Sequence, residues 1–162
     1  MLPKNSRKRA KVVWYNTFMR VIAKSLEDTA GAARVLLSQL EPAKDHATVL
    51  GLVGDLGSGK TTFTQAFAKA LGVKEVVTSP TFVIEKFYPL PSGQNFRRLV
   101  HIDTYRLGQP EELARLRFNE LLRDPQTLIM IEWAEKVEIL LPTDYRRLNF
   151  KFIDETTREI IW

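Results

Sequence analysis

The sequence predicts a three-layer α/β fold whose sheet is mostly parallel, with antiparallel strands at its edge. Predicted strands alternate with predicted helices along the 162 residues, an order typical of helices packed on both faces of a parallel sheet. Residues 48–53 and 127–132 are almost continuous apolar runs, as expected of strands that are buried on both faces. Residues 147–153 and 159–162 flank a polar turn and predict an antiparallel pair.

The first strand and helix are predicted near the N-terminus. Residues 21–23 form a short apolar run, and Ser25 is suited to cap a helix that follows it. Asp28 stands three residues after Ser25, which is close to a capping box. Apolar residues then recur at helical spacing as far as Leu40, and Pro42 ends the helix.

A strand, a turn and a helix follow without interruption. The apolar strand 48–53 leads into a glycine-rich turn at residues 54–59. Residues 61–71 then predict a helix, which Gly72 ends. This order places the start of a helix beside the carboxyl end of a buried strand.

The second half of the chain supplies the remaining elements before the last strands. Residues 82–88 and 99–103 predict two strands, joined by a turn at residues 90–95. Residues 111–122 predict one helix, and Pro110 is suited to its first turn.

Composition limits the classes of protein and of site. Apolar residues make up 44% and charged residues 27% of the chain, ordinary values for one globular domain. No run approaches about 18 consecutive apolar residues, so we expect no membrane span. The chain has no cysteine and two histidines, which excludes disulfides and argues against a zinc site. A reducing, cytoplasmic location suits this composition.

Positive charge is concentrated at the N-terminus. Residues 1–25 carry seven basic and no acidic side chains, whereas the rest of the chain has a net charge of −2. We therefore divide the chain into a basic N-terminal arm, residues 1–20, and a folded domain, residues 21–162. Two interpretations of the arm remain open. It is a disordered tail, which a start codon upstream of Met19 would explain, or it contacts RNA phosphates.

Residues 54–61, GDLGSGKT, match the phosphate-binding pattern G-x-x-x-x-G-K-[ST] in full. The glycines allow backbone N–H groups to turn inward around an anion, and the helix that follows presents its positive end there. Lys60 would neutralise β- and γ-phosphate charge, and the Thr61 hydroxyl would bind Mg²⁺. Residues 21–162 are thus predicted to form a P-loop ATPase domain that binds ATP and Mg²⁺.

Two acids end predicted strands, namely Asp103 and Glu132. Ligands of open α/β sheets bind beyond the carboxyl ends of the strands. One acid should therefore hold Mg²⁺, and the other could orient the attacking water. Alternatively, either acid caps the next helix or pairs with Arg106 or Lys136. His101 is interpreted as a packed strand residue rather than a ligand or a base.

Residues 78–81, TSPT, lie between the P-loop helix and the next strand. Their hydroxyls could reach a γ-phosphate, and Pro80 stiffens the segment, so it could act as a switch. It could equally be a plain connector. Two roles remain open for Trp133, namely packing in the core and contact with the nucleotide.

Taken together, these motifs resemble the TsaE family, the ATPase component of the bacterial machinery that makes threonylcarbamoyladenosine in tRNA. Four segments carry the resemblance in their order and spacing: GDLGSGKTTF at 54–63, TSPTF at 78–82, HIDTYRL at 101–107 and IEW at 131–133. The resemblance runs from about Ser25 to the end of the chain. Ala66 and Ala134 depart from the family pattern, which often has glycine and proline there.

The resemblance implies a P-loop NTPase-like fold and roles for individual residues. Lys60 and Asp103 would serve catalysis, and Thr61 and Glu132 would coordinate Mg²⁺. The first switch would consist of Thr78, Ser79, Pro80 and Thr81. The nucleotide would be bound by Asp55, Leu56, Gly57, Ser58, Gly59, Lys60, Thr61, Thr62, Thr29 and Arg158.

The resemblance also implies partners. Family members bind TsaD together with TsaB, support repeated turnover by hydrolysing ATP, and meet tRNA indirectly through that complex. A small-molecule kinase that uses the same P-loop is the main alternative. Arg97, Arg98 and residues 115–117 could supply a kinase lid, but the chain is short for a lid and an acceptor domain. An RNA-binding module built on the basic arm is a further alternative, and no N-K-x-D tetrapeptide favours GTP.

Overall fold

The computed structural model describes residues 11–15 and 18–162, with side chains from Phe18 onward. The strands are β1 Lys11–Tyr15, β2 Phe18–Ala23, β3 Thr48–Val53, β4 Glu85–Pro89, β5 Arg98–Asp103, β6 Thr127–Glu132, β7 Arg146–Phe152 and β8 Arg158–Ile161. The helices are α1 Leu26–Ser38, α2 Lys60–Ala70, α3 Pro110–Arg115 and α4 Phe118–Leu122, and two 3-10 turns span Ala134–Lys136 and Glu138–Leu140. Within the described ranges, no helix has the length and apolar character needed to cross a membrane.

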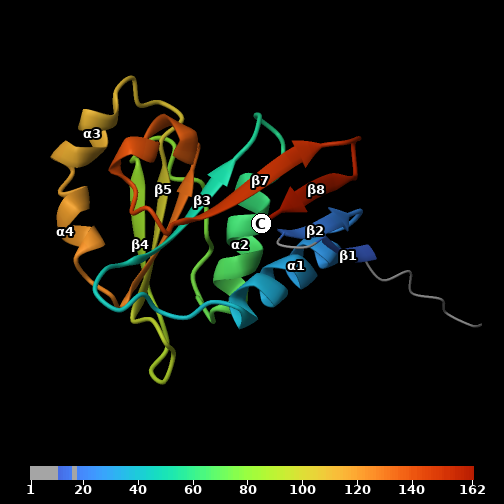
Figure 1. Ribbon diagram of the computed structural model, residues 1–162, viewed down its shortest axis with the longest axis horizontal. Coiled ribbons are helices and arrows are strands. Elements are labelled where there is room, and N and C mark those ends of the chain that lie inside the picture. Colours follow the sequence, from blue (N-terminus) through green and yellow to red (C-terminus); the bar gives the residue numbers. More distant parts are fainter. Residues whose placement is uncertain (1–10, 16–17) are drawn as a thin grey trace, which may run out of the picture.

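The described strands form one mixed sheet in the order β1-β2-β8-β7-β3-β6-β5-β4 (Figure 1). Strands β7, β3, β6 and β5 run parallel to one another. The pairs β1–β2, β2–β8, β7–β8 and β4–β5 are antiparallel. The sheet is therefore mixed rather than mostly parallel, because antiparallel strands extend it at both edges.

Helices cover both faces of the parallel strands, as the three-layer prediction required. Figure 1 shows α3 and α4 on one side of these strands and α1 and α2 on the other. The first core packs Leu36, Phe63 and Phe67 of α1 and α2 against the sheet. The second core packs Leu113 and Phe118 of α3 and α4 against the opposite face. Strands in the middle of the sheet are buried on both faces, which explains their continuous apolar runs.

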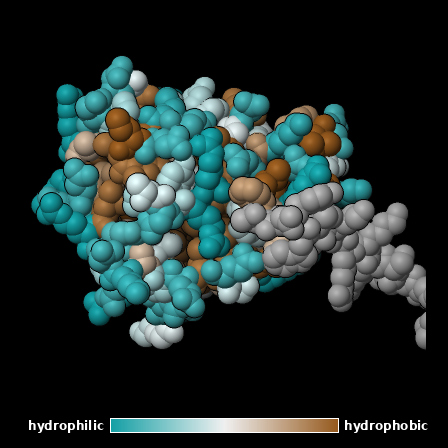
Figure 2. All heavy atoms as spheres, viewed as in Figure 1, coloured by the Kyte–Doolittle hydropathy of each residue, from teal (hydrophilic) through white to brown (hydrophobic). Residues whose placement is uncertain are grey.

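Most large apolar side chains lie in these two cores, and Figure 2 shows hydrophilic residues over most of the face that it draws. A few apolar side chains are nevertheless strongly exposed, among them Phe82 and Ile139. Exposed apolar residues are common on the surfaces of folded proteins.

The predicted cap of α1 is confirmed. Ser25 has an extended backbone, and its Oγ accepts a hydrogen bond of 3.1 Å from the Asp28 N–H. The Asp28 carboxylate in turn accepts a hydrogen bond of 2.9 Å from the Lys24 N–H. These two bonds satisfy backbone donors that the first turn of a helix leaves free, so α1 begins at a defined residue.

The N-terminal strands extend further back than the sequence indicated. Residues 11–15 form β1, and β2 begins at Phe18, so part of the predicted basic arm 1–20 belongs to the sheet. Residues 11–15 read KVVWY, and β-branched and aromatic residues favour strands. Their pairing nevertheless depends on β2, which is itself held by β8. The arm at residues 1–10 lies outside the described residues.

The strand predicted at residues 82–88 begins only at Glu85. The N–H groups of Val83 and Ile84 both donate to the Pro80 carbonyl, at 2.9 and 2.6 Å. These bonds close a turn, and Ile84 adopts a φ of 68°. The turn therefore takes residues 82–84 out of the strand.

The helix predicted at residues 111–122 is divided into α3 and α4. Arg117 has a φ of 63°, a left-handed conformation that ends the helical hydrogen-bond pattern. Leu113 before the break and Phe118 after it are both fully buried. The break allows both short helices to turn an apolar side chain toward the sheet.

Candidate nucleotide-binding site

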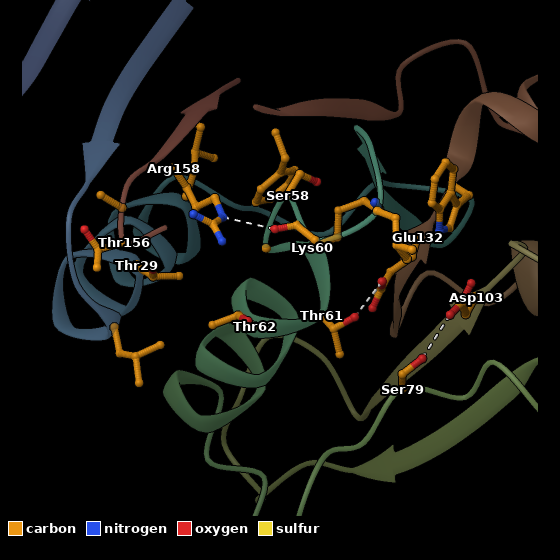
Figure 3. A pocket seen from close by; sticks show the side chains of 18 of the residues that line it. Thr29, Ser58, Lys60, Thr61, Thr62, Ser79, Asp103, Glu132, Thr156 and Arg158 are labelled. Carbon is orange, nitrogen blue, oxygen red and sulfur yellow. Dashed lines mark hydrogen bonds between the residues drawn. The ribbon is translucent and has the colours of Figure 1, made fainter. Parts of the chain in front are cut away.

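A cavity of about 610 Å³ lies at the carboxyl ends of β5 and β6 and at the start of α2 (Figure 3). Cavities of roughly 300–1,000 Å³ hold cofactors and other small ligands. The lining comes from widely separated parts of the chain, including Gly57–Thr62, Thr29, Asp103, Glu132 and Arg158. The fold therefore gathers most of the predicted site residues around one cavity, whereas Asp55, Thr78 and Pro80 do not line it.

The loop before α2 has the backbone that the glycine pattern predicted. Gly54, Gly57 and Gly59 have φ values of 147°, 76° and 100°, which side chains disfavour. A Cβ at Gly54 would lie 2.3 Å from the carbonyl oxygen of Phe150. Gly59 precedes α2 without a side-chain cap. The first N–H groups of α2 are therefore available to an anion in the cavity.

Lys60 places a buried cation in this loop. Its Nζ donates to the carbonyl oxygens of Gly54 and Asp55 at 2.6 and 2.9 Å. It also lies 4.0 Å from the centre of a Trp133 ring. Burial lowers the pKa of Lys60, and the negative charges of Glu132 and other nearby carboxylates only partly offset this effect. Burial removes the ammonium group from water, which would stabilise its charge. A bound phosphate would place a strong negative charge beside it.

Thr61 and Glu132 supply oxygen atoms at the same place. Figure 3 shows the two side chains facing each other, and Thr61 Oγ1 donates to Glu132 Oε2 at 2.8 Å. Mg²⁺ prefers oxygen ligands such as these. Nearby, Ser58 Oγ is buried without a hydrogen-bond partner among the described residues. Oxygen donors, free helix N–H groups and an unpaired hydroxyl fit a magnesium–nucleotide complex.

Asp103 is bound to the predicted switch. Its Oδ2 accepts hydrogen bonds from Ser79 Oγ at 2.9 Å and from Thr81 Oγ1 at 2.5 Å. Its Oδ1 accepts a bond of 2.9 Å from the Tyr105 N–H. Thr78 points elsewhere, since its hydroxyl accepts a bond from Lys86 Nζ. The switch segment thus lies directly against the acid at the end of β5.

Among the residues that the structure describes, neither Asp103 nor Glu132 forms an ion pair with Arg106 or Lys136. The Arg106 guanidinium lies 4.2 Å from the ring centre of Phe82. Lys136 Nζ instead donates to the backbone carbonyl of Tyr105 at 2.6 Å. The carboxylates of Asp103 and Glu132 are therefore available for other contacts.

The far end of the cavity is formed by α1 and the last strand. Thr29 lines it, and its hydroxyl donates to the Ser25 carbonyl at 3.2 Å. Arg158 at the start of β8 also lines it, and its Nε donates to the Gly57 carbonyl at 3.1 Å. Leu26 and Ile160 add apolar surface. An apolar wall with an arginine beside the phosphate loop suits the base and sugar of a nucleotide.

With this geometry in place, comparison with known proteins decides the family. The family model for the threonylcarbamoyl adenosine biosynthesis protein TsaE matches residues 23–160. The chain belongs to the TsaE family. The matched range begins at the last residue of β2 and contains every residue predicted for the site.

Individual TsaE relatives cover most of this chain. It is 36% identical over 134 residues to the tRNA threonylcarbamoyladenosine biosynthesis protein TsaE of Bacillus subtilis, covering 83% of this chain and 78% of the relative. The protein of the same name from Streptomyces coelicolor is 41% identical over 112 residues, covering 67% and 72%. The crystal structure of Bacillus subtilis YdiB superposes with a TM-score of 0.68 at 30% identity, covering 93% of this chain and 85% of YdiB.

The structure of this TsaE-family chain shows a contact that the sequence did not reveal. His101 is fully buried, as its interpretation as a packed strand residue requires, yet its Nε2 lies 2.8 Å from Glu132 Oε1. Strand alternation places His101 on the same face of β5 as Asp103. The sequence feature that could have revealed a role for His101 near the site is its spacing of two residues from Asp103.

Trp133 contributes to the site rather than to the core alone. It lines the cavity, adopts a φ of 61°, and lies against both Lys60 and the Tyr105 ring. Tyr105 lines the same cavity, as do Glu155 and Thr156 of the turn before β8. Tyr105 belongs to the segment HIDTYRL but was given no role there, whereas no motif pointed to Glu155 and Thr156, which the pairing of β7 and β8 brings to the loop.

The glycine loop leads to a test of stability. Gly54→Ala should destabilise the protein by more than Gly57→Ala, because only Gly54 would clash with the backbone of β7. Gly57→Ala should cost about 1–2 kcal/mol, the penalty for a left-handed residue with a Cβ. Urea unfolding measures both values.

Gly31 is the matched control, because it lies inside α1 and a methyl group added there would be 4.0 Å from its nearest neighbouring atom. Gly31→Ala should raise the free energy of unfolding by about 0.5–1 kcal/mol. Equal stability of Gly54→Ala and wild-type protein would contradict the described loop conformation.

Proposed function

We propose that this TsaE-family protein is a magnesium-dependent ATPase that acts in the biosynthesis of threonylcarbamoyladenosine in tRNA. The observation that carries the proposal is the convergence of Lys60, Thr61, Asp103 and Glu132 on one cavity at the carboxyl ends of the strands. The names of the relatives supply the pathway. A P-loop NTPase-like fold and a cytoplasmic location belong to the same proposal.

In this proposal the loop binds the phosphates of ATP. Lys60 gives up its bonds to the loop carbonyls for the phosphate oxygens, and the N–H groups at the start of α2 donate to the same oxygens. Thr61 and Glu132 would hold Mg²⁺, which neutralises phosphate charge when it is bound. Arg158 and Thr29 position the rest of the nucleotide.

Asp103 is the proposed residue for activating water. A carboxylate at the end of β5 can orient a water molecule and accept its proton. In the described state two of the three hydroxyls of the switch, on Ser79 and Thr81, donate to Asp103 Oδ2. In this proposal, release of Asp103 by this part of the switch would free carboxylate oxygen for the water and would couple hydrolysis to the position of the switch.

The proposed partners are the TsaD and TsaB homologues, with tRNA reached through their complex. The test is phosphate release from ATP by the purified protein, alone and after addition of its two cognate partners. Stimulation by the partners without a phosphorylated acceptor supports the proposal. Transfer of phosphate to a small molecule would instead establish the kinase alternative.

Lys60→Ala should weaken binding of Mg-ATP at least about tenfold. The loop would lose hydrogen bonds to a charged group, which contribute about 1.5–3 kcal/mol each. Calorimetry on the folded protein measures the affinity. Lys69→Ala is the matched control, since Lys69 is exposed in the last turn of α2. Equal affinity of Lys60→Ala and Lys69→Ala would contradict phosphate binding by Lys60.

Asp103→Asn should slow ATP hydrolysis by about 10²–10⁴-fold, because the amide is not a general base. Binding of Mg-ATP should change much less, because Asn retains an oxygen that accepts from the switch hydroxyls. Single-turnover hydrolysis and calorimetry separate the two effects. Unchanged hydrolysis in a folded Asp103→Asn protein would remove this residue from the mechanism.

A further inference from the structure

A histidine of β5 lies among apolar side chains in the layer between the sheet and α2. His101 is fully buried, and its neighbours in that layer of the first core are Leu99, Leu128 and Met130. A buried polar ring is unfavourable unless a hydrogen bond compensates its loss of water. The described structure gives His101 one such bond, to Glu132.

The direction of the bond follows from its partners. A carboxylate oxygen only accepts, so His101 Nε2 carries the proton and donates to Glu132 Oε1 over 2.8 Å. The other ring nitrogen, Nδ1, is buried without a hydrogen-bond partner among the described residues. In the described structure the polar contact of this ring is thus directed at Glu132 alone.

Glu132 is held separately at its main chain and at each oxygen. The Thr104 hydroxyl donates to the carbonyl oxygens of Glu132 and Trp133, at 3.0 and 2.8 Å. At the side chain, His101 binds Oε1 and Thr61 binds Oε2. A carboxylate held at one oxygen alone could rotate about its last bond. The histidine therefore fixes the plane of the carboxylate and keeps its second oxygen directed at Thr61.

We propose that His101 is a positioning residue, which fixes the orientation of the Glu132 carboxylate so that the oxygen not bound by His101 faces Thr61 and the proposed magnesium site. This inference rests on the proposed function, in which Thr61 and Glu132 hold Mg²⁺. Residues that orient metal ligands through hydrogen bonds typically change metal affinity or activity by about 10–100-fold when they are replaced. A histidine that only filled space would have no such effect on the response to Mg²⁺.

Three substitutions separate positioning from packing. His101→Met retains bulk and removes the donor. His101→Gln carries an amide N–H at about the reach of Nε2, whereas His101→Asn carries the same amide on a shorter side chain. Gln and Asn bury the same polar group, so the pair decides the question even if His101→Met does not fold. Urea unfolding establishes that each tested protein is folded.

The measurement is the affinity for ADP by calorimetry, once with Mg²⁺ and once with EDTA. The dissociation constant in EDTA divided by the dissociation constant with Mg²⁺ reports the contribution of the metal to ADP binding. This ratio involves no catalytic step. His101→Met and His101→Asn should reduce this ratio by about 10–100-fold, with little change in EDTA, and His101→Gln should restore most of it. In a Glu132→Gln background, His101→Met should have no further effect on the ratio.

Two different results would be decisive against the assignments. A ratio equal to that of wild type in folded His101→Asn and His101→Met proteins would overturn the positioning role and leave the proposed ATPase intact. Absence of any effect of Mg²⁺ on ADP affinity in the wild-type protein would overturn the proposed magnesium site itself, and the role of His101 with it.

Discussion

The buried carboxylate of Glu132 is the constraint around which this site is organised. Its residue is 3% exposed, and an unpaired charge at that depth would be strongly unfavourable. Hydrogen bonds from His101 and Thr61 compensate this burial, and the nearby Lys60 adds a favourable charge. Burial of this carboxylate therefore requires the ends of β5 and β6 and the start of α2 to keep their positions relative to one another.

Two cations that line the cavity, Lys60 and Arg158, donate to neutral oxygens. Lys60 is bound to backbone carbonyls, and burial lowers its pKa. Arg158 likewise donates to carbonyls of the loop and of its own turn. Both cations thus make hydrogen bonds to neutral oxygens, which are weaker than bonds to phosphate oxygens. The proposed nucleotide would offer both cations phosphate oxygens in place of these neutral acceptors.

The described contacts also link the predicted switch to the site. Ser79 and Thr81 donate to Asp103, and Asp103 lies opposite Glu132 in the register of β5 and β6. Movement of the segment before β4 would change the hydrogen bonds of Asp103 first. The two acids therefore have different surroundings. Glu132 is held within the layer between the sheet and α2, whereas Asp103 is held by a loop.

Prediction from the sequence succeeded where a local pattern was sufficient. Strands β3 and β6 have the predicted bounds, because each is a nearly continuous apolar run buried on both faces. Strand β1 and the break at Arg117 were missed, because each depends on packing elsewhere in the chain. The mixed character of the sheet was underestimated for the same reason, since β1 and β2 complete an antiparallel edge with β8.

The sequence by itself determined the conformation of the glycine-rich loop and the acids at the strand ends, because glycine conformation, helix ends and apolar runs are set by neighbouring residues. Only the tertiary structure decided which atoms face one another. Thr61 and Glu132 are 71 residues apart, and His101 and Glu132 are 31 apart. These contacts depend on the parallel register of β3, β6 and β5, which results from packing both faces of the sheet at once.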